Sequence, residues 1–362
     1  MVRILLCWLL LGSFYVKTLE AQPNISFFTQ AKDQAWDGMM EDSLVLRELR
    51  LMKASLRIWV HDLSERRANT LRQIAAHDIP MVAVFSLAPN PQQPTYEAFK
   101  EWSDMYELSW QAVGLWVAPE ADFWADLRKA PWKKGWNIYQ HLYRSKAWEA
   151  RQAESEALAA QIKADGFKLE TYLNPMIWDE RLAGSKAMQH ALQIGDVKAD
   201  YEVPLLLSGT PELGAAAILG YGQEFGRVAI GDFVETTASA LPVLNWEDWT
   251  QQLLLAHDFT KDIHIAHLEG LVARGWLSRI RAFNFQQPVD LYSGEIHQLS
   301  DFRDRLQQLL PLADFPLLTT IGIVLLGILA IWLGIRLLFW TFRAIADLFR
   351  SRRQPEQVEV LG

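Results

Sequence analysis

Short β-rich runs alternate with longer helical stretches from Asn24 to about residue 290, and this rhythm constrains the fold more than any other feature. A strand followed by a helix and a second strand forms a right-handed parallel crossover. The runs are Ile25–Thr29, Leu56–Val60, Met81–Leu87, Gly114–Pro119, Lys168–Asn174, Asp200–Leu207, Arg227–Asp232 and Asp262–Leu268. Eight such units in about 260 residues match the size of a (β/α)8 barrel, so we predict an α/β fold of this TIM type.

The stretches between the runs are rich in Ala, Leu, Glu, Gln and Lys, which favour helices. The clearest are Glu65–His77, Tyr96–Gln111, Tyr139–Ala164, Pro211–Phe225 and Trp246–Phe259. A doubly wound open sheet is the alternative topology. It is disfavoured because no glycine-rich phosphate-binding turn follows the first run.

Both ends of the chain are apolar. Arg3 precedes an apolar run from Ile4 to Leu11, which is the layout of a secretory signal. Pro316 to Ile335 is a 20-residue stretch without a charge, and arginines follow it up to Arg353. Such a stretch is long enough to cross a bilayer, and the basic residues mark its cytoplasmic side, although a buried core helix is the alternative. We therefore expect a signal peptide at 1–21, the barrel at 22–290, a connector at 291–315, a transmembrane helix at 316–340 and a cytoplasmic tail at 341–362.

Composition limits both chemistry and location. The single cysteine, Cys7, lies in the signal region, so the barrel has no disulfide, thiol nucleophile or cysteine metal site. Animal extracellular domains of this size usually carry disulfides, which favours the periplasmic side of a bacterial inner membrane. The formal charge of −8, without a dense basic stripe in the barrel, argues against nucleic acid as a partner.

Alternation along each run predicts which side chains point into the barrel, because successive residues of a strand face opposite sides. Where the apolar residues suit the surrounding helices, the others line the interior and its mouth. The side chains placed inside are Arg57, Trp59 and His61 from the second run, Trp116 from the fourth, and Glu170, Tyr172 and Asn174 from the fifth.

The eighth run carries Ile263, Ile265, His267 and Glu269 on one face, and we expect the polar pair at the mouth. His264 and His267 are three apart on a strand, so they point to opposite faces and cannot chelate one ion together. No HxH or HExxH pattern suggests a metal, and no G-x-S-x-G elbow suggests a serine triad. We expect no metal and no other cofactor.

Acidic residues converge on the predicted mouth. They are Glu120 after the fourth run, Glu269 after the eighth, and either Asp232 or Glu235 after the seventh, where parity does not decide. Neighbouring carboxylates repel, which raises one pKa while another group stays ionised, and this division suits one acid and one base or nucleophile. Glu120 as a cap and Glu269 as a first-turn helix acid are the structural alternatives.

The segments GLWVAPEADFW, which contains Glu120, and RVAIGDFVET, which contains Glu235, resemble the (β/α)8 glycoside hydrolases over about residues 24–290. In the large retaining clan, the resemblance implies Glu120 as acid/base and Glu235 as nucleophile. That clan usually has Asn before the first Glu, whereas this chain has Pro119, and the chitinase pattern DxxDxDxE is absent. The resemblance is architectural and indicates no particular family.

Sugar stacking on aromatic rings would follow from the same resemblance. The expected platforms are Trp116, Trp124 and Trp132, and the expected polar contacts are Arg57, His61, Tyr172, Asn174 and His267. Two hypotheses remain open. The first is a membrane-anchored glycosidase that acts on an envelope or exported polysaccharide. The second is a non-catalytic barrel that binds a glycan or a partner protein within an envelope assembly.

Overall fold

A computed structural model describes residues 23–32, 34–87, 93–117, 145–192, 194–207, 211–231, 244–289 and 293–314, with four isolated residues beyond them. Its eight strands form one parallel sheet in the order β6-β5-β4-β3-β2-β1-β8-β7. The strands are β1 (Asn24–Thr29), β2 (Ser55–Trp59), β3 (Met81–Ser86), β4 (Ala112–Val117), β5 (Lys168–Leu173), β6 (Tyr201–Pro204), β7 (Arg227–Gly231) and β8 (Asp262–Ala266).

The two ends of this sheet meet, so it closes into a barrel. Leu205 forms a parallel bridge with Ala229, and the Leu206 N–H donates to the Ala229 carbonyl at 2.8 Å. β8 pairs in parallel with both β1 and β7, which joins the first and last strands of the chain. The predicted (β/α)8 barrel is therefore confirmed, and the open doubly wound sheet is excluded.

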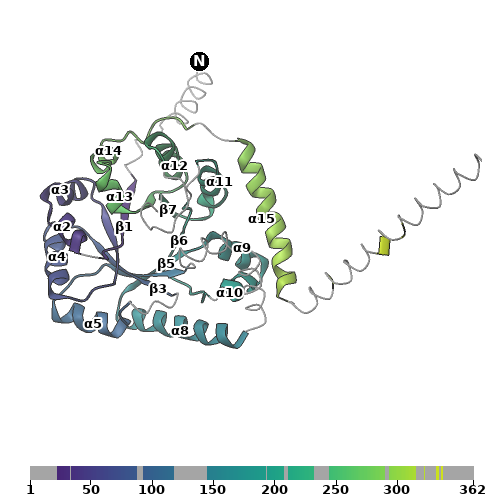
Figure 1. Cartoon of the computed structure of the whole chain (residues 1–362), viewed down its shortest axis with the longest axis horizontal. Coiled ribbons are helices and arrows are strands. Elements are labelled where there is room, and N and C mark those ends of the chain that lie inside the picture. Colours follow the sequence, from purple (N-terminus) through teal and green to yellow (C-terminus); the bar gives the residue numbers. More distant parts are fainter. Residues whose placement is uncertain are drawn as a thin grey trace, which may run out of the picture.

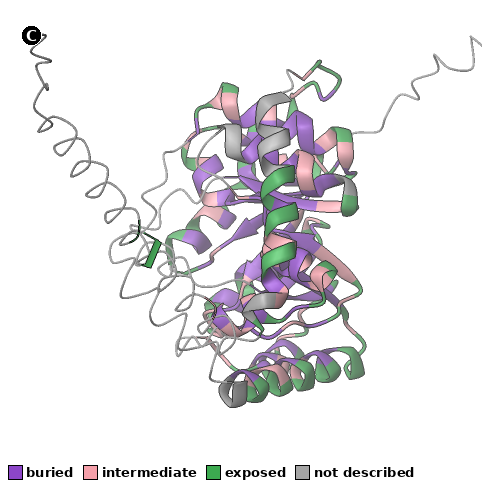
Figure 2. Cartoon of the chain, turned by 90° about the vertical axis from the view of Figure 1, so that its right-hand side faces the viewer, coloured by how far each residue is buried: buried purple, intermediate pink, exposed green. Residues whose placement is uncertain are grey.

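Helices surround the barrel (Figure 1). They are α2 (Gln34–Glu41), α3 (Ser43–Leu51), α4 (Glu65–Ala76), α5 (Tyr96–Met105), α8 (Ser145–Ala164), α9 (Pro175–Ala183), α10 (Ala187–Leu192), α11 (Pro211–Tyr221), the 3-10 turn η1 (Gly222–Glu224), α12 (Trp246–Phe259), α13 (Leu268–Ala273), α14 (Leu277–Arg281) and α15 (Ser293–Ala313). Several begin where a side-chain oxygen accepts a backbone N–H of the first turn; these caps are Ser64, Thr95, Asn174 and Asn245. In Figure 2 the strands are mostly buried, and exposed residues follow the outer sides of the helices.

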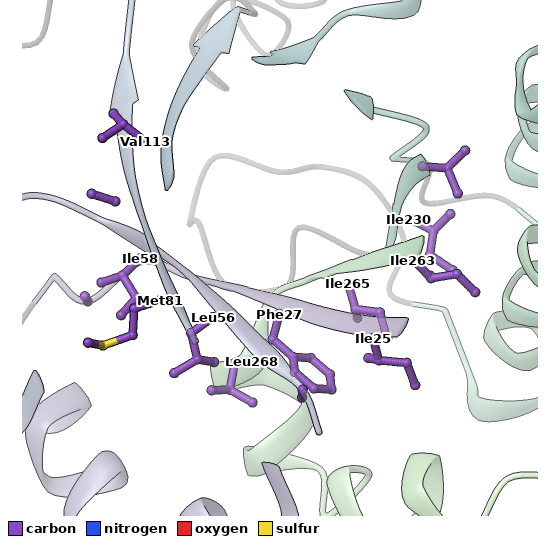
Figure 3. Packing of buried hydrophobic residues seen from close by; sticks show 14 of the residues in the cluster. Ile25, Phe27, Leu56, Ile58, Met81, Val113, Ile230, Ile263, Ile265 and Leu268 are labelled. Carbon is purple, nitrogen blue, oxygen red and sulfur yellow. The ribbon is translucent and has the colours of Figure 1, made fainter. Parts of the chain in front are cut away.

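The outward-facing side chains of the strands pack against these helices and form the larger apolar core (Figure 3). Phe27, Leu56, Ile263 and Ile265 are completely buried there. Burying an aliphatic or aromatic side chain contributes about 1.5–3 kcal/mol, so this layer supplies much of the driving force for closure. It also corrects the expected face of β8. Because the two isoleucines face the helices, the interior of the barrel receives His264 instead.

Aromatic side chains fill the interior of the barrel. The Phe28 ring centroid lies 4.8 Å from that of Tyr172 and 5.6 Å from that of Trp116. Gly114 makes room for them, since a Cβ at this position would lie 2.5 Å from the Tyr172 ring. The interior is therefore a packed core and not a pore.

A charged network lies among these interior side chains. Glu170 accepts hydrogen bonds from Arg57 at 3.3 Å and from the Tyr172 hydroxyl at 2.6 Å. Arg227 lies 3.5 Å from the same carboxylate and 3.0 Å from Asp262. Burial, and then the negative charge of Glu170, raises the pKa of the Tyr172 hydroxyl well above its usual value. Tyr172 therefore stays protonated and serves as a donor within the core.

The connector forms a helix, α15, that packs on α9, α10 and α11. It occupies nearly the whole of the connector predicted at 291–315. Arg303 lies 2.9 Å from the completely buried Asp179, which also accepts a hydrogen bond from Gln307 at 2.9 Å. A buried carboxylate needs such partners, so this pair fixes the helix on the barrel.

No helix in the described ranges is both long and apolar enough to span a bilayer. The predicted signal peptide at 1–21 lies outside these ranges. So does the predicted transmembrane helix at 316–340, apart from isolated residues, and the tail at 341–362. These three assignments stay predictions.

Candidate functional site

The candidate site is the mouth of the barrel, at the carboxyl ends of the strands. Trp116, Asn174, His61, His267 and Glu269 all lie at this end or directly after it. The remaining predicted mouth residues are outside the described ranges; they are Glu120, Asp232, Glu235, Trp124 and Trp132. Their roles therefore stay predictions.

Three aromatic rings form a group at the mouth. Trp59 and His61 are stacked with their planes 2° apart and their centroids 5.9 Å apart. The Trp116 centroid lies 5.1 Å from that of Trp59. Trp59 and His61 are half-buried, whereas Trp116 is 7 % exposed and packs with Phe28 and Tyr172 in the interior. The Trp59 Nε1 is buried and has no hydrogen-bond partner among the residues that the structure describes. Trp59 and His61 are therefore the partly open rings of this group.

Glu269 begins the helix α13 directly after β8 and reaches back to the end of β1. Its Oε1 accepts from the Thr29 hydroxyl at 2.5 Å and from the Gln30 backbone N–H at 2.7 Å. Its Oε2 is buried and finds no hydrogen-bond donor within the described ranges. One carboxylate oxygen is therefore held in place, and the other is enclosed by the protein.

Two histidines at the mouth are held neutral. Burial, followed by the charge of Lys32, lowers the pKa of His267 to about 4. Burial, followed by Lys32 and Arg67, lowers the pKa of His61 to about 4 as well. A neutral imidazole offers one donor and one acceptor nitrogen, which suits the recognition of hydroxyl groups.

A buried ion pair contacts the loop after β1 and holds it in place. The Arg67 Nε lies 2.9 Å from Asp37, and an Arg67 Nη donates to the Ala31 carbonyl at 2.6 Å. The Arg67 guanidinium also lies 4.4 Å from the Trp36 ring centroid. These contacts fix the chain between Thr29 and Lys32, so the partners of Glu269 are preorganised.

Arg57 and Tyr172 point into the barrel, as parity predicts, but they do not reach the mouth. Arg57 is 5 % exposed and pairs with Glu170, and Tyr172 is completely buried. Neither side chain can contact a substrate unless the core rearranges, so both belong to the interior of the barrel and not to its mouth. Asn174 caps α9 by accepting from the Met176 N–H at 3.0 Å.

Sequence reasoning placed Trp59 inside the barrel without assigning it to the site, and it passed over Lys32. Alternation with His61 gives the signal for Trp59, because residues two apart on a strand share one face. The signal for Lys32 is its position three residues after the end of β1, at the same edge as the other mouth residues.

Within the described ranges, no group of three or more His, Cys, Asp or Glu side chains is placed to hold a metal ion. The described part of the mouth instead offers aromatic faces, neutral imidazoles, one cation and one oriented carboxylate. Aromatic faces can stack on a ligand, and the polar groups can hydrogen-bond with it.

Comparisons with known proteins bear on the fold only. No family model and no curated protein matches the chain. Among solved structures, a GH18 chitinase from Pseudoalteromonas aurantia matches with a TM-score of 0.39 and 9% identity, over 72% of this chain and 99% of its own.

Two further solved structures are similar. The N-terminal domain of a putative aldolase from Bacteroides vulgatus has a TM-score of 0.37 and 12% identity, over 82% of this chain and 87% of its own. A chloride-inhibited dihydrodipicolinate synthase from Acinetobacter baumannii has a TM-score of 0.31 and 14% identity, over 81% of this chain and 82% of its own. Likenesses this low carry no argument about reaction or substrate. The barrel rests on its own strand pairing.

Proposed function

We propose that the barrel mouth binds a glycan. In this proposal one C-terminal helix attaches the protein to a membrane, and the barrel lies outside the cytoplasm. The observation that supports this most directly is that the Trp59–His61–Trp116 group and the oriented carboxylate of Glu269 both lie at the carboxyl ends of the strands. Sugar rings present C–H faces to aromatic rings and hydroxyls to neutral histidines and carboxylates. The membrane attachment is supported by the uncharged stretch Pro316–Ile335 and the arginines after it.

Hydrolysis of an envelope or exported polysaccharide is the finer proposal. Glu120 would protonate the departing glycosidic oxygen, and Glu235 would attack the anomeric carbon or activate water, with Asp232 or Glu269 as substitutes. Carboxyl groups about 5–5.5 Å apart would give retention, and groups about 6.5–9.5 Å apart would give inversion. Trp124 and Trp132 would extend the stacking surface.

A non-catalytic barrel is the second candidate, and one observation favours it. The Glu269 Oε1 is bound by Thr29 and by the Gln30 N–H. This carboxylate therefore fastens β8 to β1 whether or not any bond is cleaved. A binding protein for glycan would need the aromatic group and no second acid.

A glycan array with the full chain in a neutral detergent tests binding, and mass analysis of the products tests cleavage. Trp59→Ala should weaken binding about 5- to 150-fold, because a stacked ring contributes on the order of 1–3 kcal/mol. Trp178→Ala, which removes a half-buried ring from the outer side of the barrel, is the matched control. Equal binding by the Trp59→Ala variant and the wild type would refute the proposed site.

Glu120→Gln separates the two candidates. If the chain is a glycosidase, this change should lower the rate about 10²-fold or more and leave binding intact, since positioned acid catalysis has that scale. Glu101→Gln, on the exposed side of α5, is the control. Binding without products in the wild type would support the non-catalytic barrel.

A further inference from the structure

A cavity of about 690 Å³ lies on the outer side of the barrel. We call it the α8–α10 groove, because α8, the turn between α9 and α10, and the segment 194–199 enclose it. Its charged lining residues are Glu156, Lys163, Arg181, Lys186, Asp196 and Lys198. None of them belongs to the mouth, so the groove has no role in the glycan site proposed above.

Lysines surround this groove. Lys163, Lys186 and Lys198 are all exposed. The Lys163 ammonium donates to the Lys198 carbonyl at 3.3 Å, and the Lys186 ammonium lies 5.1 Å from the Trp148 ring centroid. These contacts keep two ammonium groups at the groove and leave donors for a ligand, since each ammonium has three.

The groove carries more cations than carboxylates. The Arg181 guanidinium lies 2.5 Å from Asp196 and 2.8 Å from Glu202, so its charge is compensated within the protein. Glu156 keeps its negative charge, because its partner at 2.6 Å is the neutral amide of Gln152. The lining therefore holds four cations, Arg181 and the three lysines, against the two carboxylates of Glu156 and Asp196, and this excess favours an anionic ligand.

The chain leaves the folded domain at this groove. The Ser185 hydroxyl donates to the Leu310 carbonyl at 3.1 Å, and the Lys186 N–H donates to Asp314 at 3.1 Å. Figure 1 shows the end of α15 beside α10. Only one residue separates Asp314 from the uncharged stretch that begins at Pro316, and one residue spans at most about 3.6 Å. If this stretch crosses the membrane as proposed above, the groove lies at headgroup depth, because each headgroup layer is about 5–7 Å thick.

We propose that the α8–α10 groove binds the phosphate headgroup of an anionic phospholipid, such as phosphatidylglycerol, in the leaflet that faces the barrel. The inference rests on the proposed membrane attachment. Lysines close to a bilayer surface are attracted to anionic lipids. The headgroup would orient the barrel on the membrane and hold its mouth in a fixed direction.

Native mass spectrometry of the full chain in a neutral detergent tests the proposal. Phosphatidylglycerol, phosphatidylcholine and inorganic phosphate are added in turn, and bound adducts are counted. The wild type should retain phosphatidylglycerol in preference to phosphatidylcholine. The triple variant Lys163→Gln, Lys186→Gln and Lys198→Gln should bind it at least about tenfold more weakly.

The double variant Lys53→Gln and Lys261→Gln removes exposed lysines from another side of the barrel and should bind like the wild type. Thermal unfolding without lipid checks that every variant is folded. Unchanged retention in the triple variant, equal binding of both lipids, or competition by inorganic phosphate at millimolar concentration would overturn the proposal.

Alkaline carbonate extraction of native membranes tests the attachment separately. Release of the chain into the supernatant would refute the membrane helix, and with it the headgroup position of the groove, whatever the lipid counts. Retention in the membrane together with failed lipid binding would refute the groove alone.

Discussion

Replacing His267 with glutamine should remove one part of the protein's sensitivity to acid. Burial lowers the pKa of His267 from its usual 6.5 to about 4 in the folded state. Between these values the unfolded chain binds a proton that the folded chain does not. Stability is therefore lost as the pH falls from about 6.5 to about 4, and it changes no further from this group below that range.

The magnitude follows from the two pKa values. The whole difference corresponds to about 3 kcal/mol, of which about 2 kcal/mol is lost between pH 7 and pH 5. Urea unfolding of the full chain in a neutral detergent, followed by tryptophan fluorescence, gives the free energy of unfolding at each pH. His267→Gln should lose about 2 kcal/mol less than the wild type over this interval.

His77→Gln is the matched control, since it removes one histidine from the half-exposed end of α4. His61 and His264 are present in every variant, so their own depressed pKa values cancel in the comparison. Equal losses of stability in His267→Gln and the wild type between pH 7 and pH 5 would refute the contribution assigned to His267.

Two further substitutions test the packing by the same unfolding measurement. Gly114→Ala should destabilise the protein by about 1–3 kcal/mol, because its Cβ would lie 2.5 Å from a tyrosine ring in a filled interior. The control is Gly38→Ala, whose Cβ meets nothing within 4 Å, and equal effects of the two changes would contradict the interior packing. Arg303→Met should lower the free energy of unfolding by about 3 kcal/mol, because it leaves its buried aspartate partner without a cation. The control is Arg305→Met at an exposed position. An unchanged free energy of unfolding in Arg303→Met would mean that the ion pair does not hold α15.

The barrel could be predicted because its signal is periodic and local. Each strand overlaps a run recognised from composition, although β1, β2 and β4 begin one or two residues before their runs. The inward positions of Arg57, Trp59 and Tyr172 follow from alternation alone. The predicted face of β8 was wrong, because His267 and Glu269 were expected at the mouth and alternation then placed Ile263 and Ile265 inside with them. On β2, the apolar Leu56 was assigned to the side that faces the helices. The same assignment for Ile263 and Ile265 would have placed His264 inside the barrel, as observed.

The long-range contacts could not be predicted from a single sequence. The pairing of Arg303 with Asp179 spans 124 residues, and nothing local to α15 announces that one of its arginines is buried. The interior network of Glu170 likewise depends on the register of strands far apart in the chain. The hold of Thr29 on Glu269 is of the same kind, so the candidate site was predicted by position and not by contact.

The pairing of β1 with β8 has a consequence for biosynthesis. Asn24 and Asp262, which meet at the start of this pair, are 238 residues apart. At 5–20 residues per second, a ribosome needs on the order of tens of seconds to make β8 after β1 has emerged. During that time one edge of a hydrophobic strand has no partner and is open to aggregation. If the chain is exported unfolded, this waiting period passes before folding begins, and all eight strands become available together on the far side of the membrane.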